Sequence, residues 1–370
     1  MKNWKKVIGW GIAALVMGFV ICMNILNHQN RLNGRHVILA LEAKTGPAGS
    51  MAKYSHQGYH MAIEDIKKQY GDIIELLEVD TGGSSQRAIT EFHKLKGDNM
   101  SLLVELSSPT KAVSSLLNGS MLTIASPVDV PNIANPQKGI FRIYISADAS
   151  IPTAVKFIRE KGIKNVATFT FDDESGLGFK KKFKATFQQS GGNVVSEEVF
   201  TLSQHDGIRE QIYKALKTKP EAIFIAGVGP IYAQLFRLLR QQEYQGLIVT
   251  TWAMTCPEIY EQLGTIADGV IVLAPQFQKD LTKRYEDTNH TKAYYVNVAY
   301  GYDSIMLIAD AYLSVQKGKS KTMAEAVKKM KDRHGFSGTF QILPNGDITN
   351  NISIYMMKNG KFFPIESAEK

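Results

Sequence analysis

The chain has 370 residues, of which 44% are hydrophobic and 21% are charged, and its formal net charge is +8. This length suffices for two domains, and the composition excludes a disordered chain. Most of the excess charge lies near the N-terminus: from residue 37 onward, 38 basic residues face 35 acidic ones. The sequence therefore offers no basic domain, and we predict no nucleic-acid partner.

The N-terminus carries an export signal. Three lysines precede an apolar run at residues 7–26, and no small-x-small cleavage site precedes Asn27. The run is long for a signal-peptide core and close to the length of a membrane span. We predict residues 1–26 to be a signal peptide or a membrane anchor, favouring the anchor, with the rest of the chain periplasmic or otherwise extracytoplasmic. Residues 27–35 form a polar linker.

Strand-like and helix-like segments alternate after the linker. The apolar run at residues 36–43 predicts a buried strand, a small-residue loop follows at 45–50, and apolar residues at helical spacing predict a helix over the residues after it. The next predicted elements are strands at residues 73–80, 102–106 and 121–125, with helices beginning at Ser84 or Ser85 and at Pro109.

A second series begins after residue 151. Its predicted strands cover residues 166–171, 194–200, 222–226, 247–251 and 270–273, followed by helices at 294–315 and 323–332 and by strands at 336–343 and 352–357 around an Asn345-Gly346 turn. Such alternation indicates α/β lobes with parallel sheets. Right-handed crossovers place the strand–helix loops of each sheet at one edge, where open α/β sheets bind ligands.

Sequence motifs of common catalytic sites are missing. No glycine-rich phosphate loop, Gly-x-Ser-x-Gly elbow or dinucleotide fingerprint occurs in the sequence, and we predict that the protein is not an enzyme. Cys22 lies in the apolar N-terminal run and Cys256 in the second half, which argues against an intrachain disulfide and fits no metal spacing.

One histidine pair has a spacing that can hold a metal ion. His56 and His60 lie four residues apart on a predicted helix. Without a glutamate partner or a third ligand nearby, we favour a solvated helix face or one whose histidines are satisfied by other hydrogen bonds. We therefore predict no metal and no cofactor.

Polar and aromatic residues recur where the predicted strands end. Ser107 and Ser108 follow the third strand, Asp129 follows the fourth, Ser175 follows the strand at 166–171, and Trp252 follows the strand at 247–251. Serine and aspartate are also preferred helix caps, so each one alone has a structural explanation. Their recurrence at the same edge of both series favours a ligand site.

The chain resembles the leucine/isoleucine/valine-binding branch of the periplasmic substrate-binding proteins, which have the type I fold. The resemblance runs from about residue 36 to about residue 363, and the order and spacing of its features carry it. Those features are Thr45-Gly46-Pro47 with Ala62 to Ile66, the Ser107-Ser108 turn, the loop 124–131, Ser175-Gly176 with Gly178, and Gly338 with Asn345-Gly346-Asp347.

The resemblance implies an α/β fold of two similar Rossmann-like lobes with parallel sheets, joined by three crossovers, with the ligand cleft between them. Such proteins close like a hinge around a small molecule and present it to the permease and ATPase of an ABC importer. The expected crossovers lie near residues 145–152, 273–278 and 335–341, with lobe 1 formed by 36–148 and 278–335 and lobe 2 by 149–277 and 336–366.

Carried over residue by residue, the resemblance implies a ligand site but not the family's usual ligand. Ser107 is kept, whereas Asp129 replaces a threonine and Trp252 stands where the family has an acid for the ligand's ammonium. The predicted ligand-binding residues are Met51, Ser107, Ser108, Pro127, Asp129, Ser175, Val228 and Trp252. The positions of Met51, Ser175 and Val228 lack the family's aromatic rings, and the family disulfide positions hold Gly82 and Leu106.

These departures predict a small, partly apolar ligand, an amino acid or a similar molecule, anchored by Asp129 through a cationic group and not identified with leucine. We expect Trp252→Ala to weaken binding and to cost at most about 1–2 kcal/mol of stability, because cleft residues are only partly buried. A membrane-tethered ligand sensor on the same fold is the alternative, and an exported enzyme is a second one.

Overall fold

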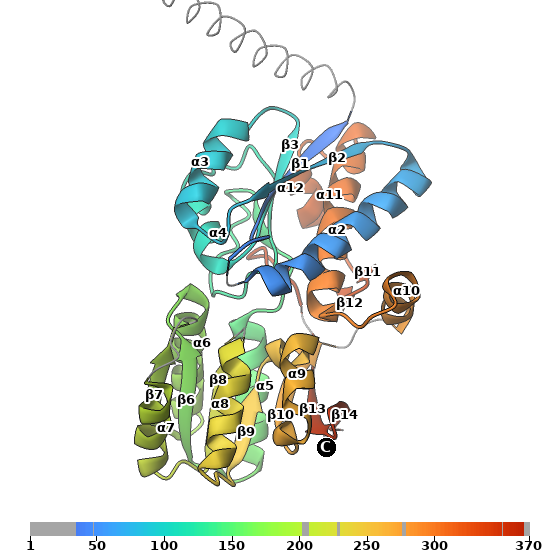
Figure 1. The fold of residues 1–370 in the computed structure, drawn as a ribbon. Coiled ribbons are helices and arrows are strands. Elements are labelled where there is room, and N and C mark those ends of the chain that lie inside the picture. The colour runs from blue at the N-terminus through green and yellow to red at the C-terminus, as the bar shows by residue number, and fades with distance from the viewer. Residues whose placement is uncertain are drawn as a thin grey trace, which may run out of the picture.

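Two lobes, each built around a sheet with helices on its faces, make up the molecule (Figure 1). The computed structural model describes residues 35–46, 48–201, 207–227, 230–275, 279–349 and 351–365. The predicted signal or anchor at 1–26 lies outside the described residues. Among the described helices, none is long and apolar enough to cross a membrane.

The first lobe holds a five-stranded sheet in the order β2-β1-β3-β4-β5, in which every pair is parallel. Its strands are β1 (His36–Glu42), β2 (Ile74–Asp80), β3 (Met100–Val104), β4 (Thr123–Ala125) and β5 (Ile140–Arg142). Its helices are α2 (Gly49–Tyr70), α3 (Ser85–Leu95), α4 (Ser107–Ser114), α11 (Tyr295–Gln316) and α12 (Met323–Lys329), with α10 (Lys279–Asn289) beside α2.

Strand β1 is buried on both faces. Ile38 and Ala40 belong to the core shared with α2, whereas Leu39 and Leu41 belong to the core shared with α3. Because alternate residues of a strand point to opposite faces, a central strand covered on both sides needs a continuous apolar run. This explains why the sequence predicted this strand correctly.

Helices α2 and α11 pack with their backbones in close approach. A Cβ atom on Gly58 would lie 2.3 Å from the carbonyl oxygen of Val298, and one on Gly301 would lie 2.7 Å from that of Ser55. Only glycine permits such an approach. The contact holds α11, which is distant in sequence, against the first lobe.

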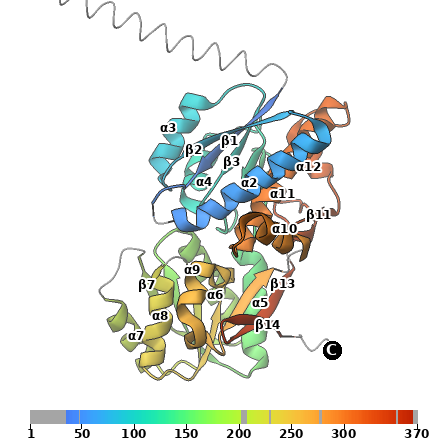
Figure 2. The same ribbon diagram turned by 45° about the vertical axis from the view of Figure 1, so that its right-hand side comes forward.

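The second lobe holds a seven-stranded sheet in the order β14-β13-β10-β9-β8-β6-β7. Figure 2 labels strands from both edges of this sheet, β7 on the left and β13 and β14 on the right. Its strands are β6 (Asn165–Phe171), β7 (Asn193–Phe200), β8 (Ala222–Ala226), β9 (Leu247–Thr250), β10 (Ile271–Pro275), β13 (Ile352–Lys358) and β14 (Lys361–Pro364). Strands β6 to β10 pair in parallel, and β13 and β14 add an antiparallel edge.

Helices cover this second sheet as well. They are α5 (Ala147–Glu160), α6 (Glu174–Gln189), α7 (Ile208–Lys217), α8 (Pro230–Gln241) and α9 (Pro257–Leu263), with the 3-10 turns η1 (Trp252–Thr255) and η2 (Gly264–Ala267). The chain passes between the lobes after β5, between β10 and α10, and before β13. The α/β fold with two lobes and parallel sheets is therefore confirmed.

Three local predictions were wrong. Strand β5 was not predicted, because it has three residues and one of them is charged. The predicted strand at 102–106 ends at Val104, and the helix after it begins at Ser107, so Pro109 lies in its first turn, where its missing N–H costs little. The predicted strand at 336–343 is a short hairpin of β11 (Arg333–Gly335) and β12 (Gly338–Phe340).

Candidate functional site

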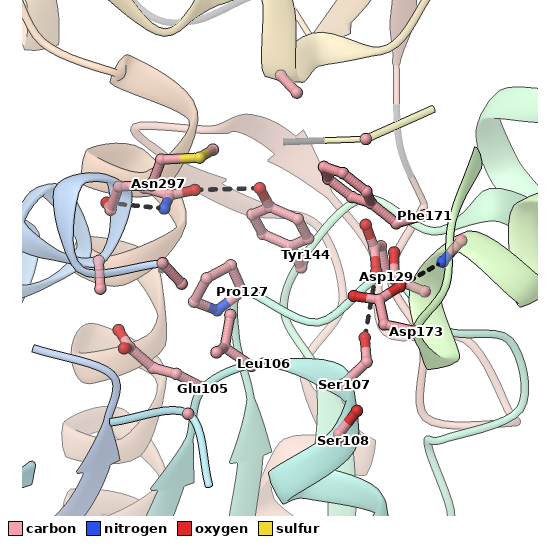
Figure 3. Close-up of a pocket in the computed structure, with 18 of the residues that line it drawn as sticks. Glu105, Leu106, Ser107, Ser108, Pro127, Asp129, Tyr144, Phe171, Asp173 and Asn297 are labelled. Atoms are coloured by element: carbon pink, nitrogen blue, oxygen red, sulfur yellow. Dashed lines mark hydrogen bonds between the residues drawn. The ribbon is translucent and has the colours of Figure 1, made fainter. Parts of the chain in front are cut away.

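A cavity of about 300 Å³ lies between the lobes, at the carboxyl ends of strands from both sheets (Figure 3). Such a volume suits a small organic molecule. The structure brings seven of the eight predicted site residues to its wall: Met51, Ser107, Ser108, Pro127, Asp129, Ser175 and Trp252. Val228 lies outside the described residues. The role of these residues in binding stays a prediction.

The polar centre of the wall is Asp129, in the loop after β4. Its Oδ1 atom accepts a hydrogen bond from the hydroxyl of Ser107 at 3.2 Å. The hydroxyl of Ser175 donates to the same carboxylate, so a serine from each lobe holds it. Burial raises the pKa of Asp129 above its usual value, although these two hydrogen bonds favour the charged form.

The serines occupy helix starts on opposite sides of the cavity. Ser107 begins α4 directly after Leu106, whose φ of +64° turns the chain sharply from strand into helix. Ser175 lies in the first turn of α6, which Asp173 caps by accepting from the backbone N–H of Gly176 at 2.7 Å. Strand-to-helix turns therefore present short hydroxyl side chains to the cavity from both lobes.

Aromatic side chains form much of the remaining wall. The indole of Trp252 lies edge-on to Tyr144, with ring centroids 6.1 Å apart, and 5.8 Å from the ring of Phe179. Trp252 is only 3% exposed. The expectation that it is only partly buried is wrong, because it packs in the core while it also lines the cavity.

A chain of hydrogen bonds crosses the cavity from lobe to lobe. Trp252 Nε1 donates to the hydroxyl of Tyr144 at 3.2 Å, and that hydroxyl donates to Asn297 Oδ1 at 3.0 Å. Asn297 Nδ2 then donates to the backbone carbonyl of Met51 at 3.2 Å (Figure 3). The chain connects η1 with the first turn of α2, so the two walls are positioned by one network.

Glu105 forms the floor of the cavity on the first lobe. Its carboxylate accepts from the hydroxyl of Tyr59 at 2.8 Å and from the backbone N–H of Ala43 at 3.0 Å. Burial raises the pKa of Glu105 to about 7, against these hydrogen bonds. The native state therefore favours the protonated acid at mildly acidic pH.

The substitution Glu105→Gln is expected to flatten the dependence of stability on pH. The folded-state pKa is raised, so the stability linked to Glu105 is fully present below pH 4.5 and is lost as pH rises through about 7. The loss amounts to roughly 3 kcal/mol at about 1.4 kcal/mol per unit. Urea unfolding at pH 5 and pH 8 measures it. Exposed Glu160→Gln is the control, and an unchanged slope in Glu105→Gln would contradict the prediction.

The charges that line the cavity have one sign. Glu105, Asp129 and Asp173 are acidic, and among the described lining residues there is no lysine, arginine or histidine. A ligand with a free carboxylate would meet three acids and no cation. The arrangement instead suits a neutral or positively charged molecule with an apolar part.

Several residues that line the cavity were not predicted from the sequence as site residues: Glu105, Tyr144, Phe171, Phe179, Tyr294 and Asn297. Tyr144 follows β5, the strand that was not predicted. Tyr294 and Asn297 lie at the start of α11, whose apolar sequence reads as core. Only Glu105 had a usable signal, because it is an acid at the end of a buried apolar strand.

Comparisons with known proteins agree with this architecture. The family described as periplasmic binding protein matches residues 37–361. A leucine-binding protein from Thermotoga maritima is 21% identical, with a TM-score of 0.77, covering 90% of this chain and 97% of that one. No match was found among curated proteins.

Two other similar solved structures are of proteins associated with different small molecules. A solute-binding protein of an ABC transporter from Rhodopseudomonas palustris, in complex with 3,4-dihydroxybenzoic acid, is 18% identical with a TM-score of 0.77, covering 90% of this chain and 96% of that one. A fatty acid ABC transporter substrate-binding protein from Thermomonospora curvata is 17% identical with a TM-score of 0.76, covering 90% and 91%. These likenesses concern the fold, whereas the family match spans most of the sequence. The chain belongs to the periplasmic binding protein family.

Proposed function

We propose that this chain is the solute-binding component of an ABC importer outside the cytoplasm. It captures a small, partly apolar molecule that carries a protonated amine, and it delivers this molecule to the permease. The observation that carries the proposal is the cavity between the lobes, with Asp129 held by one serine from each lobe. The lobe boundaries expected from the sequence belong to the same proposal.

The hydrogen bonds of the serines support an amine over a carboxylate. In the family the serine at the position of Ser107 is expected to bind a ligand carboxylate. Here its hydroxyl donates to Asp129, so its proton is already engaged. The Asp129 carboxylate accepts two hydroxyl protons and keeps acceptor capacity for an ammonium group. The ligand's positive charge would also offset the three acids.

The aromatic wall supports an apolar body next to that amine. Tyr144 and Phe171 lie on the side of the cavity that faces away from Glu105 in Figure 3. Trp252 and Phe179 also line the cavity, and the indole of Trp252 packs against the rings of Tyr144 and Phe179. Such rings pack well against an aromatic or alkyl group, and their faces attract cations. Aromatic amines, alkyl amines and amino-acid amides therefore fit the wall better than free acids do.

Asp129→Asn is expected to weaken binding of such an amine by roughly 10- to 100-fold, because a hydrogen bond to a charged group contributes about 1.5–3 kcal/mol. A thermal-shift screen over aromatic amines, alkyl amines, amino acids, amides and aromatic acids identifies the ligand, since a ligand that binds only the native state raises its apparent stability. Calorimetry then compares the wild type with Asp129→Asn.

The matched control is Asp172→Asn, the same change at an exposed aspartate that does not line the cavity. It should leave the affinity unchanged. Binding of leucine or valine with a Kd below about 10 μM, near −7 kcal/mol, would contradict the proposed ligand class. Tight binding of an aromatic acid that survives Asp129→Asn would contradict it as well.

A further inference from the structure

A second polar cluster lies on the first lobe, and its residues do not line the cavity. His56 and His60 extend from α2 toward Glu78 on β2. His60 Nε2 is 3.3 Å from Glu78 Oε2, and His56 Nδ1 contacts Glu78 Oε1. The expectation that this histidine pair has no glutamate partner is therefore wrong. The parallel pairing of β1 with β2 places Glu78, which is 18 residues after His60 in the sequence, next to the two histidines.

A second acid faces the same cluster from the core. Glu42, at the end of β1, is only 1% exposed, and neither of its carboxylate oxygens has a hydrogen-bond partner. Its Oε2 atom lies 3.5 Å from His56 Nδ1 and its Oε1 atom lies 3.9 Å from Lys44 Nζ. Burial and the neighbouring acids Glu105 and Glu78 raise the pKa of Glu42 to about 9.

The donor atoms have the spacing of a metal-ion coordination shell. Ligand atoms of His56, His60 and Glu78 all lie within 4.8 Å of one another. Zinc bonds of about 2.0–2.1 Å in a tetrahedron place neighbouring ligand atoms roughly 3.3–3.4 Å apart. The 3.3 Å between His60 Nε2 and Glu78 Oε2 matches that edge.

We propose that His56, His60 and Glu78 bind a divalent transition-metal ion such as Zn²⁺. Imidazole nitrogens and carboxylate oxygens are the ligand set that zinc accepts. Two histidines at i and i+4 on one helix face, together with a carboxylate from a neighbouring strand, provide three protein ligands. Three protein ligands leave one coordination position for water, as in open zinc sites, and Glu42 lies beside them, 3.5 Å from His56 Nδ1.

Lys44 takes the place of the cation when no metal ion is bound. Its Nζ atom lies 3.3 Å from Glu78 Oε1, and its side chain is 36% exposed, so it can turn outward into water. An incoming metal ion would displace it. Lys44→Ala is therefore expected to bind Zn²⁺ more tightly than the wild type, because the competing ammonium is gone.

Titration of the full chain with ZnCl₂ after removal of metal by EDTA tests the proposal by calorimetry. One high-affinity Zn²⁺ per chain is expected, with a rise in melting temperature. His60→Ala and Glu78→Gln should each lower the affinity by about 100-fold or more, since losing even second-shell groups costs 10–100-fold. Exposed His93→Ala, a matched change on α3, should leave the affinity unchanged.

Co²⁺ provides a second readout that is independent of affinity. A tetrahedral cobalt spectrum is expected in the wild type and should be lost in His60→Gln, a milder change for use if His60→Ala fails to fold. Absence of a bound ion at micromolar Zn²⁺ would overturn the proposal. So would one bound Zn²⁺ whose affinity is equal in the wild type, His60→Gln and Glu78→Gln. Neither result bears on the ligand of the cavity.

Discussion

Replacing Arg142 by methionine is expected to lower the free energy of unfolding by about 3–5 kcal/mol. The Arg142 side chain is fully buried, and its Nε donates to Asp347 Oδ1 at 2.8 Å. Its Nη1 donates to the backbone carbonyl of Val130. Methionine keeps most of the volume but leaves the Asp347 carboxylate, which is 8% exposed, without its cation. Breaking one side of a buried ion pair in this way is strongly destabilising.

The pair Arg142–Asp347 also supports the ligand cavity. Val130 belongs to the loop that carries Pro127 and Asp129, and Asp347 belongs to the turn that precedes β13. Arg142→Met should therefore weaken ligand binding as well, because the loop loses its tie to this turn. Urea unfolding monitored by circular dichroism measures the stability, and calorimetry measures the binding.

The double variant Arg142→Met with Asp347→Asn provides the control. It removes both charges, so the uncompensated carboxylate disappears and part of the stability should return. A loss below about 1 kcal/mol in Arg142→Met would contradict the prediction. A double variant no more stable than Arg142→Met would show that the ion pair is not the cause.

Arg142 also illustrates why part of the fold could be predicted from the sequence and part could not. Strand β1 was predicted because both of its faces meet core, and this leaves a continuous apolar run in the sequence. Strand β5 was missed because its arginine reads as a surface residue. Its partner, Asp347, lies 205 residues away in the sequence, and no local sequence pattern predicts such a pair.

The residues of the candidate site also fall into two groups, those that the sequence predicted and those that it missed. Ser107 and Asp129 were found because strand ends and helix starts are visible in the sequence. Tyr144 and Asn297 were missed because their position depends on how the two lobes meet. The same holds for the histidine pair. Its spacing on α2 could be seen in the sequence, but the proximity of Glu78 depends on the pairing of β2 with β1. Long-range pairing, rather than local propensity, sets these contacts.

Trp252→Ala is expected to cost about 3–5 kcal/mol of stability, because truncating a buried aromatic side chain leaves a hole that the core cannot fill. The indole packs against Tyr144 and Phe179. The same change widens the cavity and removes one of the hydrogen bonds that the hydroxyl of Tyr144 accepts. Ligand affinity should fall together with stability, which calorimetry and urea unfolding measure on the same samples.

Trp252→Phe separates the packing role from the hydrogen bond. Phenylalanine keeps an aromatic ring in the core, so most of the stability should remain, with about 1 kcal/mol lost for the missing Nε1 donor. Tyr144 positions Asn297 and, through it, the backbone of Met51 on the opposite wall. If that chain of hydrogen bonds positions the two walls, Trp252→Phe should reduce affinity by a larger factor than its small effect on stability would suggest. Equal affinity in Trp252→Phe and wild type would contradict this and leave Trp252 with a packing role alone.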